Sequence, residues 1–199
     1  TAVGSVEHVR EDVRAQLVYI GPSHVQHAEQ IIAAARASKH VSGAKPMALS
    51  VADVEAMGES CQAAGVRLGV GLHRRHHPAY RKAREVIRAG ELGRMLLVET
   101  RWIVASGRRA GWWQNPEMIG AYIMMARGVH LVDFIHYLSG RDVESVAMMT
   151  DARGEDRPLE ETAIGTLRLG EDAFATLVAT RHAGSAANGF TVYGTEGYM

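Results

Sequence analysis

The sequence predicts an α/β protein in which a parallel sheet is followed by an α+β domain with a large open, mostly antiparallel sheet. Within residues 17–72, short apolar runs alternate with helical patterns and are joined by short links. This order is typical of βαβ units, whose strands are parallel. From residue 95 onward, several β-prone runs follow one another with hairpin-sized links, which favours antiparallel pairing. The change of pattern places a first domain at residues 1–90 and a second at 91–199.

The elements of the first domain follow from apolar patterns and their end signals. The run LVYI is short, apolar and closed by Gly21 and Pro22, which is typical of a buried strand and its turn. Ser50 and Asp53 form a start that resembles a capping box, and Gly65 stands where a helix commonly ends. We therefore expect strands at 17–20, 40–42 and 67–72 and helices at 25–37 and 50–64.

The second domain is predicted in the same way. Pro78 is suited to the first position of a helix, and Gly90 and Gly140 follow the ends of two helical patterns. The turn at residues 170–172 separates two β-prone runs. We expect helices at 78–89 and 123–138, and strands at 95–104, 143–149, 162–169, 173–180 and 190–193.

Composition excludes some classes of function. Lys and Arg total 22 and Asp and Glu total 22, so the net charge is zero and gives no reason to expect binding to nucleic acid or a charged membrane surface. Cys61 is the only cysteine, which rules out an intrachain disulfide and fits a cytoplasmic location. We see neither a membrane-spanning apolar run nor a signal peptide. Both ends of the sequence look cut, and we expect a fragment of a longer protein.

Lys45 occupies the predicted turn after the second strand. Carboxyl ends of strands are where open α/β sheets bind ligands. Pro46 fixes its own φ angle and biases Lys45 toward an extended backbone, so the lysine is held stiffly over the sheet edge. The alternative is a solvated loop lysine without a chemical role.

Six short motifs, taken in order, resemble those of the glucose–fructose oxidoreductase and inositol dehydrogenase family, also called the Gfo/Idh/MocA oxidoreductases. The nearest branch is that of the 1,5-anhydrofructose reductases and sugar dehydrogenases. The motifs are PSHVQH at 22–27, AKP at 44–46, HRR at 73–75 with Pro78, GW at 111–112, GVHLVD at 128–133 and VYGTEG at 192–197. No single motif is specific, and it is their order and spacing over nearly the whole chain that carries the resemblance.

The resemblance implies a partial Rossmann-type NAD(P)-binding domain at 1–90 that lacks the first strand and the Gly-rich loop. It implies a C-terminally incomplete domain for substrate binding and oligomerisation at 91–199, with homo-oligomers formed through the open sheet. The expected activity is hydride transfer between NAD or NADP and a secondary alcohol or ketone of a sugar, a polyol or a related cyclic hydroxy compound.

The resemblance also implies a site. His130 would be the base that takes the hydroxyl proton, and Lys45 would donate a hydrogen bond to the substrate oxygen. Residues expected to bind the cofactor are Pro22, Ser23, His24, His27, Lys45 and Trp112. Residues expected to bind the substrate are His73, Arg75, Trp113 and His130. The alternatives are structural: a packed His130, a helix cap for Ser23, tryptophans that pack on the domain below, and a structural hydrogen bond for Asp133.

Three positions depart from the family pattern. Ala44 stands where the family has Glu, GAY at 120–122 replaces a triple glycine, and Ala126 replaces an Asp four residues before the histidine. These departures favour an alternative in which the chain is a catalytically degenerate homologue with a binding or assembly role. A further alternative is a metal-binding protein, because His73, His76 and His77 lie close together. Arg74 and Arg75 beside them would repel a cation, and we expect no metal.

Overall fold

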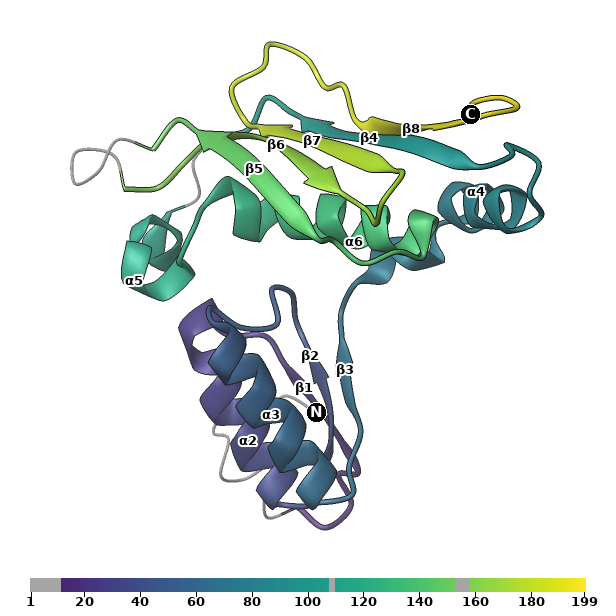
Figure 1. Cartoon of the computed structure of the whole chain (residues 1–199). Coiled ribbons are helices and arrows are strands. Elements are labelled where there is room, and N and C mark those ends of the chain that lie inside the picture. Colours follow the sequence, from purple (N-terminus) through teal and green to yellow (C-terminus); the bar gives the residue numbers. More distant parts are fainter. Residues whose placement is uncertain (1–11, 108–109, 153–157) are drawn as a thin grey trace. The chain divides into compact units, whose positions relative to one another are not determined.

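The computed structural model describes residues 12–107, 110–152 and 158–199, and the chain forms two compact units (Figure 1). The first unit contains the residues up to Gly71 and also the segment Gly111–Gly120. The second unit contains Leu72–Ala110 and Ala121–Met199.

The first unit is a three-stranded parallel sheet with two helices packed side by side on one face (Figure 1). Its order, β1-β2-β3, is that of one half of a doubly wound sheet. Ser50 caps α3 as predicted, because its hydroxyl oxygen accepts a hydrogen bond of 3.1 Å from the Asp53 amide. The elements are β1 (Leu17–Ile20), α2 (His27–Arg36), β2 (His40–Gly43), α3 (Val51–Ala63) and β3 (Leu68–Val70).

The helices of the first unit cover its small core. Ile31 of α2, Val41 of β2 and Met57 of α3 are each at most 2% exposed and pack in one cluster. The expected helix from residue 25 begins at His27, because His24–Gln26 form a separate 3-10 turn. This turn directly follows the end of β1, so it lies at the carboxyl edge of the sheet.

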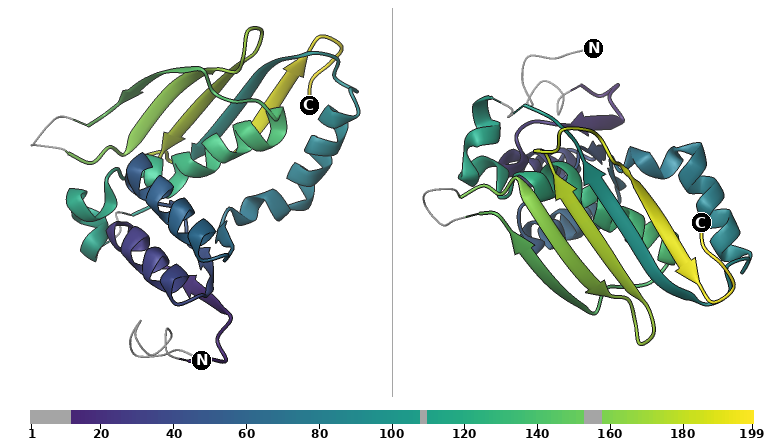
Figure 2. Two further views of the ribbon diagram at one scale, coloured as in Figure 1. Left: turned by 60° about the horizontal axis from the view of Figure 1, so that its bottom comes forward. Right: turned by 90° about the horizontal axis from the view of Figure 1, so that it is seen from above.

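The second unit is a five-stranded sheet of order β5-β6-β7-β4-β8, with α6 along one face (Figure 2). No helix among the described residues covers the opposite face (Figures 1 and 2). The elements are α4 (Pro78–Arg88), β4 (Met95–Ile103), α6 (Val129–Ser139), β5 (Ser145–Thr150), β6 (Thr162–Arg168), β7 (Phe174–Thr180) and β8 (Gly189–Gly194). The short helix α5 (Pro116–Ile119) and the 3-10 turn Gly111–Gln114 lie in the first unit.

The expectation of a mostly antiparallel sheet is confirmed, with one exception. The pairs β5–β6, β6–β7 and β4–β8 are antiparallel, whereas β4 and β7 are parallel. The parallel pair arises because the chain leaves β4 through α6, enters the sheet at its far edge, and returns by the meander β5-β6-β7. The length of the links between consecutive strands predicts only the pairing of neighbours in sequence, so it could not predict the pairing of β4 with β7.

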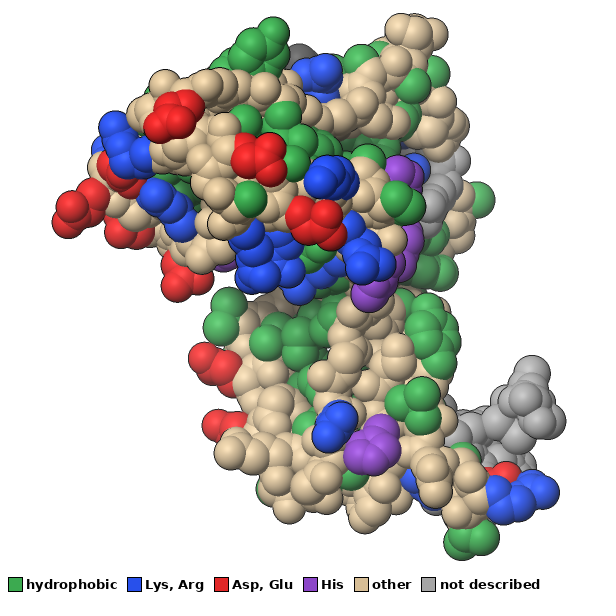
Figure 3. All heavy atoms as spheres, turned by 90° about the vertical axis from the view of Figure 1, so that its right-hand side faces the viewer, with side chains coloured by type: hydrophobic (Ala, Val, Ile, Leu, Met, Phe, Trp, Pro, Cys, Tyr) green, Lys and Arg blue, Asp and Glu red, His purple; other side chains and the backbone are tan. Residues whose placement is uncertain are grey.

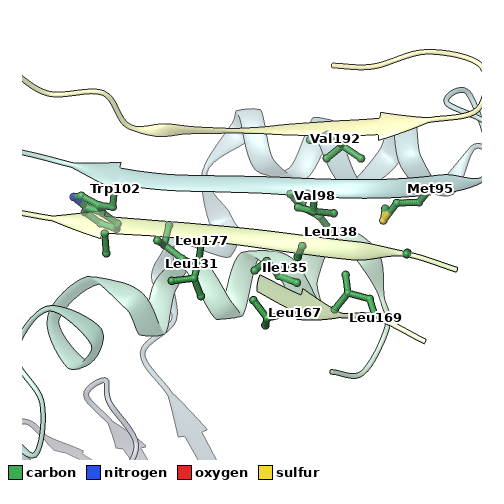
Figure 4. Close-up of a cluster of buried hydrophobic side chains, with 14 of the residues drawn as sticks. Met95, Val98, Trp102, Leu131, Ile135, Leu138, Leu167, Leu169, Leu177 and Val192 are labelled. Atoms are coloured by element: carbon green, nitrogen blue, oxygen red, sulfur yellow. The ribbon is translucent and has the colours of Figure 1, made fainter. Parts of the chain in front are cut away.

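The core of the second unit lies between α6 and the sheet (Figure 4). Leu131, Ile135 and Leu138 of α6 recur at helical spacing and point toward the strands. Val98 of β4 and Leu177 of β7 meet them and are fully buried. Such a face-to-face layer of helix and sheet fixes the rotation of α6, and with it the direction of every other α6 side chain.

Helix α4 groups with the second unit, whereas the sequence analysis ends the first domain at residue 90. Ala83 is fully buried in the core that α6 shares, and the Tyr80 ring lies 4.1 Å from Phe134 and 5.4 Å from Phe190 between centroids. In sequence, a helix that begins directly after a parallel strand looks like the continuation of the βα alternation. Its packing partners are distant in sequence, so the pattern alone assigns it to the wrong neighbour.

One helical stretch, Pro116–Ser139, is long and apolar enough to cross a membrane by length and composition, although we expected no such run. Gly120 interrupts it with a φ of 76°. The remainder is the α6 region, whose apolar side chains face the sheet of the second unit. Burial of 56% of its most apolar window is the pattern of a core helix.

We predict that Leu177→Ala destabilises the second unit by about 2–5 kcal/mol, because it leaves a cavity in a layer that cannot collapse onto it. Val146→Ala is the matched control, since Val146 is 60% exposed on the edge strand β5 and its loss should change stability by about 0.5 kcal/mol or less. Urea unfolding followed by circular dichroism measures both. Equal losses in the two variants would contradict the core described here.

Candidate functional site

The candidate site of the second unit is built on the start of α6. A π-helical turn, Met124–Gly128, leads into the helix, although the sequence pattern predicts one regular helix from residue 123. Turns of this type bond from residue i to i+5 and often occur at functional sites. Ala126 lies about one turn before His130 and is only 6% exposed.

Glu160 holds the N-terminal end of this helical region. Its two carboxylate oxygens accept hydrogen bonds from the amides of Tyr122 and Met124, at 2.9 and 2.8 Å. Its backbone carbonyl accepts a third, from the Ile123 amide at 3.2 Å. The first amides of a helix lack internal partners, and a negative charge beside them is favourable. Glu160, which is 4% exposed, therefore fixes where the helix begins.

A second buried acid lies beside this cap. Glu161 accepts hydrogen bonds from Arg181 and contacts the His182 ring nitrogen Nε2 at 2.6 Å. Arg181 also lies 5.6 Å from the Tyr122 ring centroid and donates to the carbonyl of Ser106. The network supports Tyr122, a position at which the sequence analysis notes a departure from the family pattern.

His130 is 3% exposed in the first turn of α6 and lies among aromatic rings. The Trp102 indole of β4 is stacked on it with centroids 5.5 Å apart and planes 29° apart. The His73 ring meets it edge-on, also at 5.5 Å. The structure thus brings together two of the residues expected to bind substrate, His73 and His130, and adds Trp102, which sequence reasoning did not identify.

Arg75, also expected to bind substrate, is engaged within the protein. Its Nε and one terminal nitrogen both donate to Asp133, with the Nε contact at 2.8 Å. These hydrogen bonds raise the pKa of the Arg75 guanidinium above its ordinary value. Asp133 is 6% exposed and thus has the structural hydrogen bond considered in the sequence analysis. Arg75 therefore ties its 3-10 turn to α6, and its expected contact with substrate stays a prediction.

Two other arginines contact the indole of Trp102. The guanidinium carbon of Arg74 lies 3.7 Å from the ring centroid and that of Arg127 lies 4.8 Å from it. Cations are attracted to the faces of aromatic rings. Figure 3 views the second unit from the side of α4, a helix rich in Arg and Lys, and basic side chains gather there. This part of the second unit is positively charged although the chain as a whole is neutral.

The residues expected at the cofactor are in the first unit. The ring of His24 is 3% exposed and meets Trp112 and Trp113 edge-on, at 5.0 and 5.1 Å. The two indoles stack on each other at 4.6 Å. The His24 Nδ1 also lies 3.4 Å from the carbonyl oxygen of Ile119. These contacts explain why Gly111–Gly120 joins the first unit, so the two tryptophans lie together and pack at the end of β1.

His27 is fully buried, and its two ring nitrogens lie next to backbone carbonyls. Nδ1 is 2.9 Å from the oxygen of Pro46, and Nε2 is 3.3 Å from that of Pro22. The shorter contact indicates that Nδ1 carries the donated proton, a tautomer inferred from geometry. The expected direct contact between His27 and a cofactor does not fit this burial. The His27 ring instead connects the turn after β1 to the turn after β2 through these two contacts.

Ser23 and Lys45 occupy those two turns. Ser23 stands at the N-cap position of the 3-10 turn, but its hydroxyl donates to the side-chain oxygen of Gln26 at 2.7 Å and caps no backbone amide. Lys45 lies two residues after Gly43, the last residue of β2, and precedes Pro46 through a cis peptide bond. Both residues are therefore at the carboxyl edge of the parallel sheet, as predicted. Whether they share one site with His130 stays a prediction.

The described residues contain no group of three or more His, Cys, Asp or Glu side chains placed to hold a metal ion. This finding gives no support to the metal-binding alternative suggested by His73, His76 and His77.

Residues 1–72 match the oxidoreductase family with an NAD-binding Rossmann fold, and residues 80–199 match the GFO/IDH/MocA C-terminal domain. Fold and sequence together define the class of two-domain oxidoreductases. The chain belongs to the GFO/IDH/MocA family.

Similar proteins include 1,5-anhydro-D-fructose reductase of Ensifer adhaerens, 30% identical over 100% of this chain and 60% of the reductase. Myo-inositol 2-dehydrogenase of Thermotoga maritima is 28% identical over 87% of this chain and 52% of the dehydrogenase. A solved structure, the WlbA dehydrogenase from Bordetella pertussis in complex with NADH and UDP-GlcNAcA, is 26% identical with a TM-score of 0.88 and covers 97% of this chain and 57% of that protein. The chain thus spans just over half the length of these relatives.

We predict that Glu160→Ala destabilises the second unit by about 2–4 kcal/mol, because two buried amides lose charge-assisted hydrogen bonds. Glu160→Gln should lose less stability than Glu160→Ala, since the side-chain amide oxygen of glutamine can still accept one of the two hydrogen bonds. Glu171→Ala is the matched control, an exposed acid in the turn before β7 whose loss should be nearly neutral. Urea unfolding of the three variants measures the differences, and a neutral Glu160→Ala would exclude the cap.

Proposed function

We propose that this chain is part of an NAD(P)-dependent oxidoreductase that transfers a hydride to or from a secondary alcohol or ketone of a sugar, a polyol or a related cyclic hydroxy compound. The family membership supports this reaction type, and the similar proteins are named as a sugar reductase and an inositol dehydrogenase. The observation that carries the proposal is His130, a buried histidine held between Trp102 and His73 at a helix start that Glu160 fixes.

His130 acts as the general base in this proposal. Removal of a hydroxyl proton needs a group that exchanges protons near neutral pH, and histidine is the side chain best suited by its intrinsic chemistry. Its ring cannot turn freely, because Trp102 stacks on it and His73 meets it at its edge. A fixed ring keeps its nitrogens in one direction, which is what positioned proton transfer requires.

Lys45 donates a hydrogen bond to the substrate oxygen and stabilises negative charge that develops there. Its place two residues after the end of β2 supports this role, since ligands of open α/β sheets bind at the carboxyl ends of strands. His27 links the Lys45–Pro46 turn to the turn after β1, so neither turn moves independently of the other. Substrate contacts from His73 and Trp113 belong to the same proposal.

The residues at this sheet edge fit the nicotinamide end of NAD or NADP. Bound there, the nicotinamide would supply the hydride acceptor or donor. Pro22, Ser23 and His24 form the rim after β1, and the indole of Trp112 lies against His24. The 199 residues contain no GxGxxG motif, so the glycines that cradle a pyrophosphate are not among them.

The second candidate is a homologue of this family that has lost turnover. Ala126, which replaces an acid, and Tyr122, which is 5% exposed where the family has glycine, favour it. In this reading the units keep their fold and serve binding or assembly.

The direct test uses protein made from the complete reading frame that contains this sequence. NAD and NADP are each incubated with a panel of neutral sugars and polyols, and formation of the reduced nicotinamide is followed by absorbance. Dinucleotide reduction with at least one of these compounds supports the proposed reaction. Cofactor binding without turnover on the whole panel favours the degenerate homologue.

We predict that His130→Ala lowers kcat of that protein by about 10²–10⁴-fold, the usual contribution of a positioned acid or base. Ala126→Asp should raise kcat about tenfold, because a carboxylate one turn away can orient the imidazole and assist proton transfer. The gain should vanish in a His130→Ala background. An equal gain with and without His130 would reject the role given to this histidine.

We further propose a cytoplasmic homo-oligomer that assembles through the open face of the five-stranded sheet. The register places Met149, Ile164, Phe174 and Tyr193 on this face, and these apolar side chains are 36–80% exposed. Apolar surface of this kind often marks a site of association. A second copy of the chain is the partner that family resemblance implies.

Ile164→Arg should shift the protein toward monomer, because a charged side chain in the middle of the face would be desolvated on pairing. Val51→Arg is the matched control, an exposed apolar residue on α3 of the first unit. Light scattering after size-exclusion chromatography gives the mass. A monomeric wild-type protein would contradict the proposal, as would an oligomer that tolerates arginine at 164.

A further inference from the structure

Arg74 has a side chain that the fold does not satisfy. It lies in the 3-10 turn His73–His76, and its guanidinium packs on the indole of Trp102. Its Nε is buried and has no hydrogen-bond partner. Within the described residues, the Arg74 side chain forms neither a hydrogen bond nor an ion pair, in contrast to Arg75, which binds Asp133.

Such a group is unusual inside a protein. Buried polar atoms nearly always have partners, and a guanidinium carries five donors and a permanent charge. Stacking on Trp102 compensates the charge from the face of the guanidinium, but it satisfies none of the N–H donors at its edge. The Nε donor of Arg74 therefore has no acceptor among the described residues.

The surroundings of Arg74 indicate the charge of a ligand that would supply this acceptor. Arg127 contacts the same indole, with its guanidinium carbon 4.8 Å from the ring centroid. The acid on this part of α6, Asp133, is taken by Arg75. A guanidinium without an ion-pair partner, such as that of Arg74, favours negative charge more than it favours a neutral hydroxyl group.

We propose that Arg74 binds an oxyanion carried by the substrate, either a carboxylate or a phosphate monoester on a sugar. The planar guanidinium matches both groups through paired N–H donors. Trp102 contacts both arginines and also His130, so the anion would be anchored beside the base. This inference rests on the proposed function, which supplies the sugar part of the ligand.

The competing explanation is that Arg74 only packs on an aromatic ring. Arg84 of α4 is such a case, because its guanidinium carbon lies 4.4 Å from the ring centroid of Tyr137 and its nitrogens are not among the buried atoms that lack partners. Arg84 thus serves as a matched control: a half-buried, ring-stacked arginine of the same unit.

The experiment is isothermal titration of the full chain with glucuronate, glucose 6-phosphate and glucose, which differ at a single carbon. We expect one of the two charged sugars to bind at least about tenfold more tightly than glucose, as charge-assisted bidentate contacts are the strong ones. The stronger of the two identifies the oxyanion as carboxylate or phosphate. Arg74→Met should abolish the preference for the charged sugar, and Arg84→Met should leave it unchanged.

Thermal unfolding of each variant checks that the fold is retained, and Arg74→Lys covers the case in which Arg74→Met does not fold. A lysine keeps the positive charge but lacks the paired N–H donors of a guanidinium, so Arg74→Lys should retain only part of the preference for a charged sugar. Equal affinity for the three sugars, no binding of any of them, or the same loss in Arg84→Met as in Arg74→Met would overturn the inference.

Turnover separates this inference from the proposed function. If the complete protein oxidises neutral polyols and shows no preference for charged sugars, the function stands and the oxyanion site is wrong. If charged sugars bind through Arg74 but no dinucleotide reduction occurs with any substrate, the oxyanion site stands and the proposed reaction is wrong.

Discussion

The carboxylate of Glu160 is the interaction on which the second unit's site depends. It lies just before β6 and accepts the amides that open the helical region leading into α6. Because a buried helix end without acceptors is costly, this one side chain decides where the π-helical turn begins. Ala126, Arg127 and His130 take their directions from that start. A residue in the link before β6 thereby sets the geometry of a helix that carries the candidate chemistry.

Trp102 connects the packing of the second unit to its electrostatics. The indole belongs to the buried layer between β4 and α6, yet it also contacts Arg74, Arg127 and His130. A ring that is 5% exposed is a rigid support, so the cations it holds do not relax freely. Trp102 therefore belongs to both the core and the candidate site, and a substitution in the core that moves this indole would also move the ring of His130.

Local signals in the sequence predicted local structure well. The apolar run of β1, the cap at Ser50 and the glycine ends of helices all depend on neighbouring residues, and each was found where the sequence indicates. The expectation that β1 is buried was wrong for Leu17 and Tyr19, which are exposed. Glu160, the parallel pairing of β4 with β7 and the placement of α4 depend on residues far apart in the chain. Their signal is absent from any short window: a buried acid before a strand looks like an exposed one until its amide partners are known.

The segment Gly111–Gly120 has a consequence for how the protein can be divided. It belongs to the first unit, whereas the residues on either side belong to the second, so the backbone passes between the units three times. A polypeptide that ended at Gly71 would keep the parallel sheet but lose the indoles that pack on His24. A single proteolytic cut at one passage would leave two covalent connections. Each unit has its own core, but neither is one continuous stretch of sequence. A single truncation of the chain therefore cannot isolate either unit.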